Sequence, residues 1–355
     1  MSGVASAPSA PSAPGQATSW LSMDAWRRLF RDRPLIPLLA LLAVLVLMFE
    51  LGPGSVNANW VGVTLRAAVP LAILAGCQTL AMLTGGIDLS VGAVASAAGF
   101  LVATLVAGQG LPVAILIALV AAALAGLANG VGVGVFRVHP LIMTLGMSLV
   151  VLGLANVWQI TMVQTGAGVP EALRTLGTGS FANLVGGGDD ATVSPLAAIA
   201  GMLPYSLLVF VPIAALILIG LRRSGYGRLL YAVGDNPIAA RLSGTRSWQV
   251  LIVLYVISAV FAAIAGMLIS GLTNVASVTL ADSYVLPSVA AAVIGGTSIM
   301  GGRGGYAGTI VGALILTVLT SLLSSLGLPE ALRQVLFGSI IVIVAAAYTR
   351  VTSET

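Results

Sequence analysis

The tract LTGGIDLSVGA at residues 83–93 interrupts a long hydrophobic stretch, and VIGGTSIMGGRGG at residues 293–305 interrupts a second one. When the first pair of glycines in each tract is aligned, Asp88 falls opposite Ser298. Glycine weakens a helix interior and is favoured where a helix ends in a left-handed turn. The two tracts therefore predict two related places in the chain where a hydrophobic helix breaks on glycine.

The composition indicates a membrane protein. The chain has 355 residues, of which 58% are hydrophobic and 7% are charged. Soluble domains carry about 25% charged residues, so most of this chain is expected to lie in lipid. Its 43 glycines are dispersed among apolar runs, as in bundles whose transmembrane helices approach closely. The net charge of +4 gives no reason to expect a nucleic-acid partner.

All 15 basic residues are arginine, and the chain contains no lysine. A P-loop needs its lysine to reach the phosphates of ATP, so any ATP used by this protein is expected to be bound and hydrolysed by another polypeptide. We expect no catalytic residue, no cofactor and no metal site. The single cysteine, Cys77, lies in an apolar run and has no partner for an intrachain disulfide. We expect it to be a buried packing residue.

The hydrophobic pattern predicts an all-α fold with about ten transmembrane helices, because a spanning helix needs about 20 mostly apolar residues. The ten segments are 34–52, 60–84, 89–108, 112–135, 141–163, 205–221, 249–271, 285–300, 306–326 and 333–349. The segment 285–300 is short, and a re-entrant or broken helix is the alternative. Residues 1–33 are expected to form a disordered tail and a basic pre-membrane segment, 34–349 the transmembrane domain and 350–355 a C-terminal tail.

Arginine placement predicts the orientation, since cytoplasmic loops carry an excess of positive charge. Four arginines precede the first segment, and ten spans place eight more inside, which makes 12 of the 15 cytoplasmic. Both termini are then cytoplasmic. The longest outer loop, 164–204, is expected to contain a short helix near 195–202. The longest inner loop is 222–248. Two long loops on opposite faces favour one soluble partner on each face, although a solvated outer loop is an equal alternative.

The inner loop contains the sequence GDNPIAARLSG at residues 234–244. Asn236 or Asp235 can cap a short helix, Pro237 suits its first position, and Gly244 can end it in a left-handed conformation. The result is a short amphipathic helix parallel to the membrane, with small residues on one side. It is either an ordinary interfacial helix or a docking element for a cytoplasmic motor.

Four tracts together resemble the permease subunits of ribose/xylose/galactoside-type bacterial ABC importers. They are GGIDLSVG at 85–92, HPLIMTLG at 139–146, GDNPIAARLSG at 234–244 and GGTSIMGGRGG at 295–305. The resemblance runs from about Leu35 to Tyr348. It implies a type II importer-like permease in the bacterial inner membrane that forms a dimer with a second copy or a paralogue. It also implies an ABC ATPase on the cytoplasmic face and a periplasmic sugar-binding protein on the outer face.

The same resemblance implies that Asn236 to Gly244 form the coupling helix, seated in a groove of the ATPase. The residues carried over to this role are Gly234, Asp235, Asn236, Pro237, Ala240, Arg241, Ser243 and Gly244. Related permeases carry pentoses, hexoses, polyols and furanoses, and the tracts do not distinguish among these solutes.

Polar residues in the apolar segments are the candidates for the translocation path. They are Gln78, Thr79, Asp88, Ser90, Thr144, Ser148, Asn156 and Ser298. Hydrogen bonding between helices is the alternative role for each of them. For Asp88 we favour a structural role, in which its carboxylate caps the amide of Ser90 or Val91 at the start of a helix, over contact with a solute.

An ion-coupled secondary transporter of a small solute is the alternative function. Proton relays need titratable groups within the membrane, and the segments offer mainly Asp88, with Arg66 near an outer rim. This scarcity favours the importer permease. An intramembrane enzyme is disfavoured because no pair of nucleophile and base is present.

Overall fold

A computed structural model describes residues 35–52, 54–162, 168–184 and 195–329, together with parts of 331–339. Within these residues the regular structure is helical, and the only β-type pairing is an isolated bridge between Ser180 and Pro204. The predicted N-terminal tail, most of the segment 333–349 and the C-terminal tail lie outside the described residues.

Among the described residues, six helices are long and apolar enough to cross a membrane, and the number of spans becomes seven if one bent pair of helices is counted as one span. The six are α3 (Ala58–Leu83), α4 (Val91–Gln109), α5 (Leu111–Gly134), α6 (Pro140–Met162), α12 (Ser247–Thr273) and α14 (Tyr306–Ser325). The bent pair is α9 (Leu207–Arg223) and α10 (Gly225–Asp235), which meet at 69°. Two shorter apolar helices are α2 (Leu35–Leu51) and α13 (Val285–Ile294).

These helices coincide with nine of the ten predicted segments, so the all-α, multi-pass character of the chain is confirmed. The number of spans is not, because α2, α9 and α13 are shorter than a standard span. The predicted segment 285–300 is helical only to Ile294 and then continues as turns, in agreement with the broken-helix alternative.

In the described parts of the predicted loops there are five short helices. They are α7 (Glu171–Thr178), η1 (Phe181–Leu184), α8 (Pro195–Met202), α11 (Pro237–Leu242) and η2 (Asp282–Tyr284). The helix expected near 195–202 is confirmed as α8. The inner segment 222–248, expected to be a loop around one short helix, instead contains the two helices α10 and α11.

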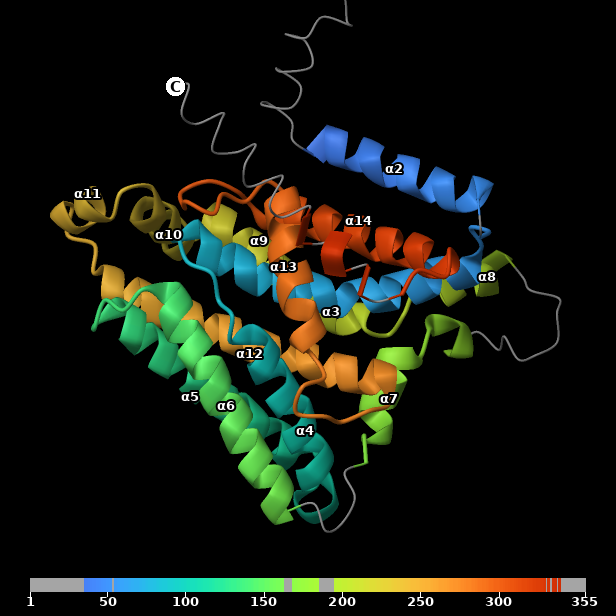
Figure 1. Ribbon diagram of the computed structural model, residues 1–355, viewed down its shortest axis with the longest axis horizontal. Helices are drawn as coiled ribbons and strands as arrows, with labels where there is room; N and C mark the ends of the chain where they lie inside the picture. Colours follow the sequence, from blue (N-terminus) through green and yellow to red (C-terminus); the bar gives the residue numbers. More distant parts are fainter. Residues whose placement is uncertain are drawn as a thin grey trace, which may run out of the picture.

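Helices α3 and α12 form the centre of the bundle. Helix α12 packs against α3, α4, α5 and α7, while α14 packs against α2, α3 and α13. Figure 1 shows α4, α5 and α6 on one side of this centre and α2 and α14 on the other. Apolar side chains cover much of the outside, as on α6, where Leu154 is 66% and Ile160 is 82% exposed. A surface of this kind suits contact with lipid rather than water.

Loops that the arginine pattern assigns to the same face gather at the same end of the bundle. At one end, the amide of Gly302 donates to the carbonyl of Leu83 at 3.0 Å, and Gly86 lies against Pro140. At the other end, α7 packs against the end of α12 and α8 packs against α3. In Figure 1, α10 and α11 lie at the left of the molecule and α7 and α8 at the right.

The two glycine-rich tracts end α3 and α13 with the same hydrogen-bonded turn. The amides of Gly85 and Gly86 donate to the carbonyls of Met82 and Ala81, at 2.9 and 3.1 Å. In the second tract, Gly296 and Thr297 donate to Val293 and Ala292, both at 2.9 Å. This pair of bonds defines a Schellman motif, which needs a left-handed residue after the helix.

The left-handed residues are Gly85, with φ of 77°, and Gly296, with φ of 87°. The relationship between the tracts is therefore real, but the expected register is wrong by one residue. Gly85 corresponds to Gly296 rather than to Gly295, and Asp88 does not fall opposite Ser298. Matching identical letters missed this shift because the shared feature is the backbone conformation.

Candidate coupling surface and solute path

Helix α11 forms as the tract at 234–244 predicts. The side-chain oxygen of Asn236 accepts hydrogen bonds from the amides of Ile238 and Ala239, at 3.1 and 3.0 Å. These bonds satisfy two of the amides that a helix start leaves unpaired. At the other end, Gly244 has a φ of 87°, and Thr245 donates to the carbonyl of Ala240 at 3.0 Å. Asn236 is thus the capping residue, whereas Asp235 is the last residue of α10.

The exposed face of α11 is apolar and basic. Ile238 is 63% exposed and Leu242 is 84% exposed, and Arg241 is exposed between them. Ala240, in contrast, is only 5% exposed and belongs to the main hydrophobic core. The expectation that small residues form a contact face is therefore wrong for Ala240, which faces its own chain. Pro237, Ser243 and Gly244 are exposed.

Gly234 joins α10 to the glycine-rich ends of α3 and α13. A Cβ atom at this position would lie 1.8 Å from the carbonyl oxygen of Leu83 and 2.8 Å from the amide nitrogen of Gly302. Only glycine permits such an approach of three backbone segments. The predicted coupling tract therefore begins with a direct main-chain contact to both glycine-rich tracts.

Four predicted path residues meet in a buried polar cluster at this end of the bundle: Gln78, Asp88, Ser90 and Thr144. One carboxylate oxygen of Asp88 accepts from the amide and the hydroxyl of Ser90, at 3.0 and 2.6 Å. Its other oxygen accepts from the hydroxyl of Ser258 at 3.1 Å. The side chain of Gln78 donates to the carbonyl of Asp88 at 2.7 Å and accepts from its amide at 3.2 Å.

Thr144 and one further side chain, Asn129, connect this cluster to other helices. The side-chain amide of Asn129, on α5, donates to the hydroxyl of Ser90 at 2.9 Å. The hydroxyl of Thr144, on α6, accepts from the amide of Leu89 at 3.0 Å and donates to the carbonyl of Ile87 at 3.2 Å. Sequence reasoning missed Asn129 and Ser258, since nothing in the pattern relates α5 or α12 to residue 88.

The preferred structural role of Asp88 agrees with this geometry, with one correction. Its bond to the amide of Ser90 is present, but helix α4 begins at Val91 and its capping position is Ser90. Asp88 therefore stabilises the turn before the helix rather than capping the helix itself. Asp88 is only 2% exposed.

The remaining predicted path residues are dispersed. Thr79 bonds the hydroxyl of Thr309 on α14 at 2.7 Å. Ser148 and Asn156 donate to carbonyls of their own helix, those of Leu145 and Leu152. The hydroxyl of Ser298 accepts from the amide of Met300 at 3.1 Å and so stabilises the second glycine-rich turn. The structure does not bring these four together with the Asp88 cluster to form one cavity.

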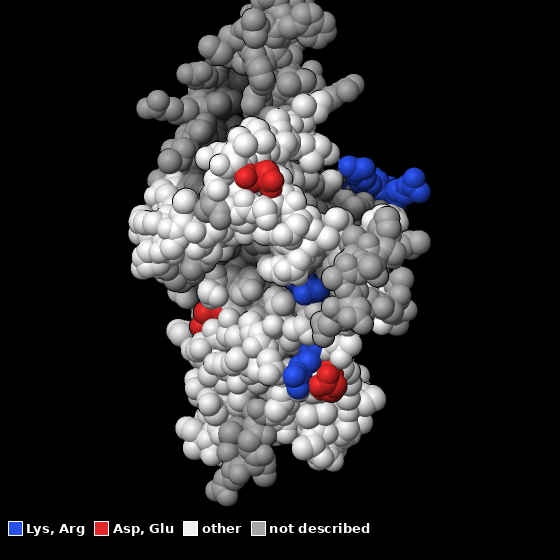
Figure 2. Space-filling view, turned by 90° about the vertical axis from the view of Figure 1, so that its right-hand side faces the viewer, with Lys and Arg blue, Asp and Glu red and all other residues white. Residues whose placement is uncertain are grey.

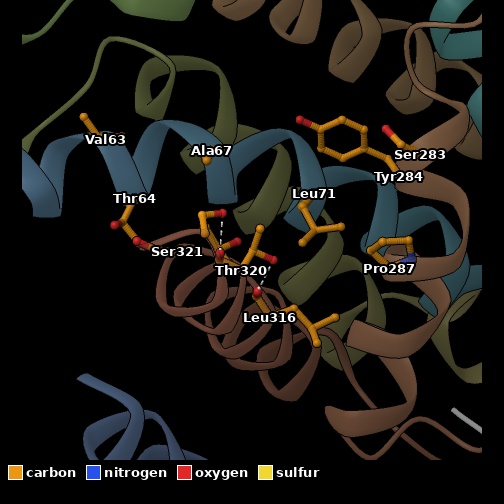
Figure 3. Close-up of a pocket in the computed structure, with 12 residues that line it drawn as sticks. Val63, Thr64, Ala67, Leu71, Ser283, Tyr284, Pro287, Leu316, Thr320 and Ser321 are labelled. Atoms are coloured by element: carbon orange, nitrogen blue, oxygen red, sulfur yellow. Dashed lines mark hydrogen bonds between the residues drawn. The ribbon is translucent and has the colours of Figure 1, made fainter. Parts of the chain in front are cut away.

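A cleft of about 570 Å³ lies instead between α3, α14 and the start of α13. Seven of its twelve lining residues carry a hydroxyl group. They are Thr64, Ser283, Tyr284, Thr317, Thr320, Ser321 and Ser324. Figure 3 shows Thr64 and Leu71 on α3 on one side and Thr320 and Ser321 on α14 on the other. Sequence reasoning missed this site, although the hydroxyls at 317, 320, 321 and 324 share one side of a helix.

The cleft is built from the halves of α3 and α14 that lie toward α7 and α8, the predicted outer end of the bundle. Figure 2 views the molecule from this side. Charged side chains are few and scattered there, and the surface is hollowed between its upper and lower parts. The one ion pair within the described residues, between Arg174 and Glu171 at 3.1 Å, is exposed on α7.

Comparison with known proteins identifies related chains. A family model described as "Branched-chain amino acid transport system / permease component" matches residues 61–345. The ribose import permease protein of Bacillus subtilis (strain 168) is 31% identical over 308 residues, which cover 86% of this chain and 90% of that protein. The fructose import permease protein of Rhizobium meliloti is 31% identical over 316 residues, 88% of this chain and 84% of the relative.

The ribose import permease protein of Escherichia coli (strain K12) is 33% identical over 312 residues, which cover 87% of this chain and 91% of that protein. No solved structure matches this chain.

Proposed function

The chain belongs to the branched-chain amino acid transport system / permease component family, and on that premise we propose that it is the membrane-spanning permease subunit of an ATP-binding cassette importer for a monosaccharide. Relatives that are similar over most of both chains are named as ribose and fructose import permeases. The apolar helices and apolar surface of this chain agree with such a role.

The observation that best supports ATP coupling is the combination of α11 and Gly234. Helix α11 exposes Ile238 and Leu242, two large apolar side chains, at the arginine-rich end of the bundle. Gly234, in the last turn of the preceding helix α10, contacts Leu83 and Gly302 with no intervening side chain. A soluble partner seated on α11 would therefore be connected through main-chain contacts to the end of α3 and to the loop between α13 and α14.

The proposed partners are those that the related import permeases suggest. An ABC ATPase binds ATP and docks on the exposed side of α11, a periplasmic sugar-binding protein docks at the end formed by α7 and α8, and a second permease copy or paralogue completes the path. The protein itself has no catalytic role and needs no cofactor of its own. We place it in a bacterial inner membrane.

An ion-coupled secondary transporter is less well supported. Its charge carrier would be an acidic group inside the bundle, and Asp88 is the candidate. Both carboxylate oxygens of Asp88 already accept hydrogen bonds from serine residues of the same chain. The relatives named above are import permeases of sugars, and none of their names indicates ion coupling.

Reconstitution tests the proposal. The permease is placed in liposomes with an ABC ATPase and a sugar-binding protein from the same genome, and uptake of radiolabelled ribose, fructose and galactose is measured. Uptake of one sugar that requires ATP is the expected result. Uptake driven by a proton gradient in liposomes that contain the permease alone would refute the proposal.

Substitution of Leu242 by Glu tests the docking surface. Because Leu242 is 84% exposed, the variant should fold normally but should lose ATPase binding and ATP-dependent uptake. The control is Leu326→Glu, which changes a leucine that is 56% exposed and follows α14 at the opposite end. Equal loss of uptake in the two variants, or normal uptake and normal ATPase recovery with Leu242→Glu, would contradict docking on α11.

A further inference from the structure

Thr64, on α3, has an unsatisfied hydroxyl in the cleft between α3, α13 and α14. Threonines in these helices commonly donate to the carbonyl four residues earlier, as Thr317 and Thr320 do at 2.9 and 2.7 Å. Thr64 does not: it is only 7% exposed, and its buried hydroxyl has no hydrogen-bond partner among the residues that the structure describes. Because a buried hydroxyl without a partner is unfavourable, whatever fills the cleft is expected to supply one.

The opposite wall of the cleft offers a second hydroxyl. Ser321, on α14, accepts a hydrogen bond from the indole nitrogen of Trp60 at 3.0 Å. A serine hydroxyl that accepts one bond can still donate another. Trp60 lies one helical turn before Thr64 on α3, so Thr64 and Ser321 lie near each other across the cleft (Figure 3).

The rest of the lining restricts the chemistry of the occupant. None of the twelve lining residues is Asp, Glu, Arg or His. A charged or zwitterionic solute that left water here would lack a counter-charge, which is costly. Tyr284 and Pro287, at the other end of the cleft in Figure 3, offer apolar ring faces. Hydroxyl groups combined with an aromatic face suit a neutral molecule that has both hydroxyls and C–H faces.

We propose that this cleft is a transient binding site for a neutral, polyhydroxylated solute, in which Thr64 and Ser321 contact the hydroxyl groups of a monosaccharide. This proposal rests on the proposed function and assigns the place where the solute contacts the permease. The volume of about 570 Å³ lies within the usual range of small-molecule sites, which is about 300–1,000 Å³. The cleft replaces the buried Asp88 cluster as the candidate contact.

Substitution of Thr64 by Val tests the hydroxyl contact, since valine keeps the shape and removes the oxygen. In liposomes with the ATPase and the binding protein, Thr64→Val should reduce uptake of the transported sugar about 2- to 10-fold, the effect of losing one hydrogen bond. Thr64→Ser should restore it. The control is Thr273→Val on α12, outside the cleft, whose hydroxyl already donates to the carbonyl of Ile269 at 2.9 Å. It should leave uptake unchanged.

A labelling experiment keeps the proposal testable even if Thr64→Val does not fold. The chain's only cysteine, Cys77, is fully buried and so gives no background with a charged thiol reagent. In nanodiscs, Ser321→Cys should react with a sulfonated methanethiosulfonate, because water reaches the cleft. Leu154→Cys, on the apolar outside of α6, should not react. Sugar-loaded binding protein should slow the reaction at position 321.

The outcomes separate the two proposals. If the unmodified transporter fails to take up any of ribose, fructose and galactose with ATP, the proposed function fails. If it transports a sugar, but Thr64→Val behaves as Thr273→Val does, only the cleft assignment is overturned. Absence of labelling at Ser321→Cys would likewise overturn it, because the cleft would then be closed to water.

Discussion

Replacement of Gly234 by Ala is the sharpest test of how α10 is joined to the membrane helices. The added Cβ atom would lie 1.8 Å from the carbonyl oxygen of Leu83 and 2.8 Å from the amide nitrogen of Gly302. These two groups are also hydrogen-bonded to each other at 3.0 Å. The new methyl group therefore enters a contact between three backbone segments, none of which can move aside by rotating a side chain.

The expected free-energy change follows from three contributions. Overpacking at a tight contact costs about 1–3 kcal/mol. Loss of the bond between Gly302 and Leu83 costs about 0.5–1.5 kcal/mol. Alanine is favoured over glycine within a helix by about 0.5–1 kcal/mol, which offsets part of this. We expect a net destabilisation of about 1–3 kcal/mol.

Thermal unfolding of the purified permease in detergent measures this effect, with ATP-dependent uptake measured in parallel. The control is Gly220→Ala in α9, where a Cβ atom would meet no atom of the described residues within 4 Å. That variant should melt at the same temperature or slightly higher, since only the helix preference changes. If Gly234→Ala and Gly220→Ala have the same melting temperature and the same uptake, the backbone contact at Gly234 does not require glycine.

Three further substitutions test local contacts. Asp88→Asn should lower the free energy of unfolding by about 1 kcal/mol or less, because the amide oxygen can still accept from Ser90. Asp88→Leu leaves three donors unpaired and should lower it by about 1–3 kcal/mol for each buried donor. Uptake and melting of the two variants are measured together, and a stable but inactive Asp88→Asn protein would point to a direct role of the charge. Asn236→Ala removes both bonds that cap α11 and should cost about 0.5–2 kcal/mol; an unchanged melting temperature, with Asn236→Asp as the conservative control, would contradict the cap. Gly244→Ala puts a side chain at a φ of 87° and should lower the free energy of unfolding by about 1 kcal/mol through backbone strain alone, since no atom of the described residues lies within 4 Å. A rise in melting temperature would contradict the left-handed conformation at Gly244.

The apolar helices could be predicted from the sequence because each is a continuous hydrophobic run bounded by glycine, proline or arginine. Helix α10 could not. Its sequence, GYGRLLYAVGD, contains three glycines, which disfavour a helix, and lacks a long apolar run. It forms because Leu230 and Val233 are buried in the main core, a tertiary contribution that local propensity does not contain.

The candidate site also contains features that could be predicted from the sequence and features that could not. The cap of α11 at Asn236 could be predicted, since capping depends on residues two and three positions away. The bond between Asp88 and Ser258 could not, because it joins positions 170 residues apart. The cleft was missed for the same reason, because Thr64 lines a cleft only when α3 is packed against α14. Motif matching identified the exposed tract at 234–244, but it did not identify the Asp88 cluster or the cleft, which depend on how the helices pack.

The contact of Gly234 with Leu83 and Gly302 has a mechanical consequence. Where two helices meet through side chains, a small displacement of one is absorbed as the side chains change rotamer and the packing yields. Here backbone meets backbone, so the contact has almost no compliance. A push on α10 that moved Gly234 toward α3 would have to displace the end of α3 or the loop before α14 by a similar amount. The contact therefore transmits a displacement of α10 instead of absorbing it, because glycine places no side chain between the two backbones.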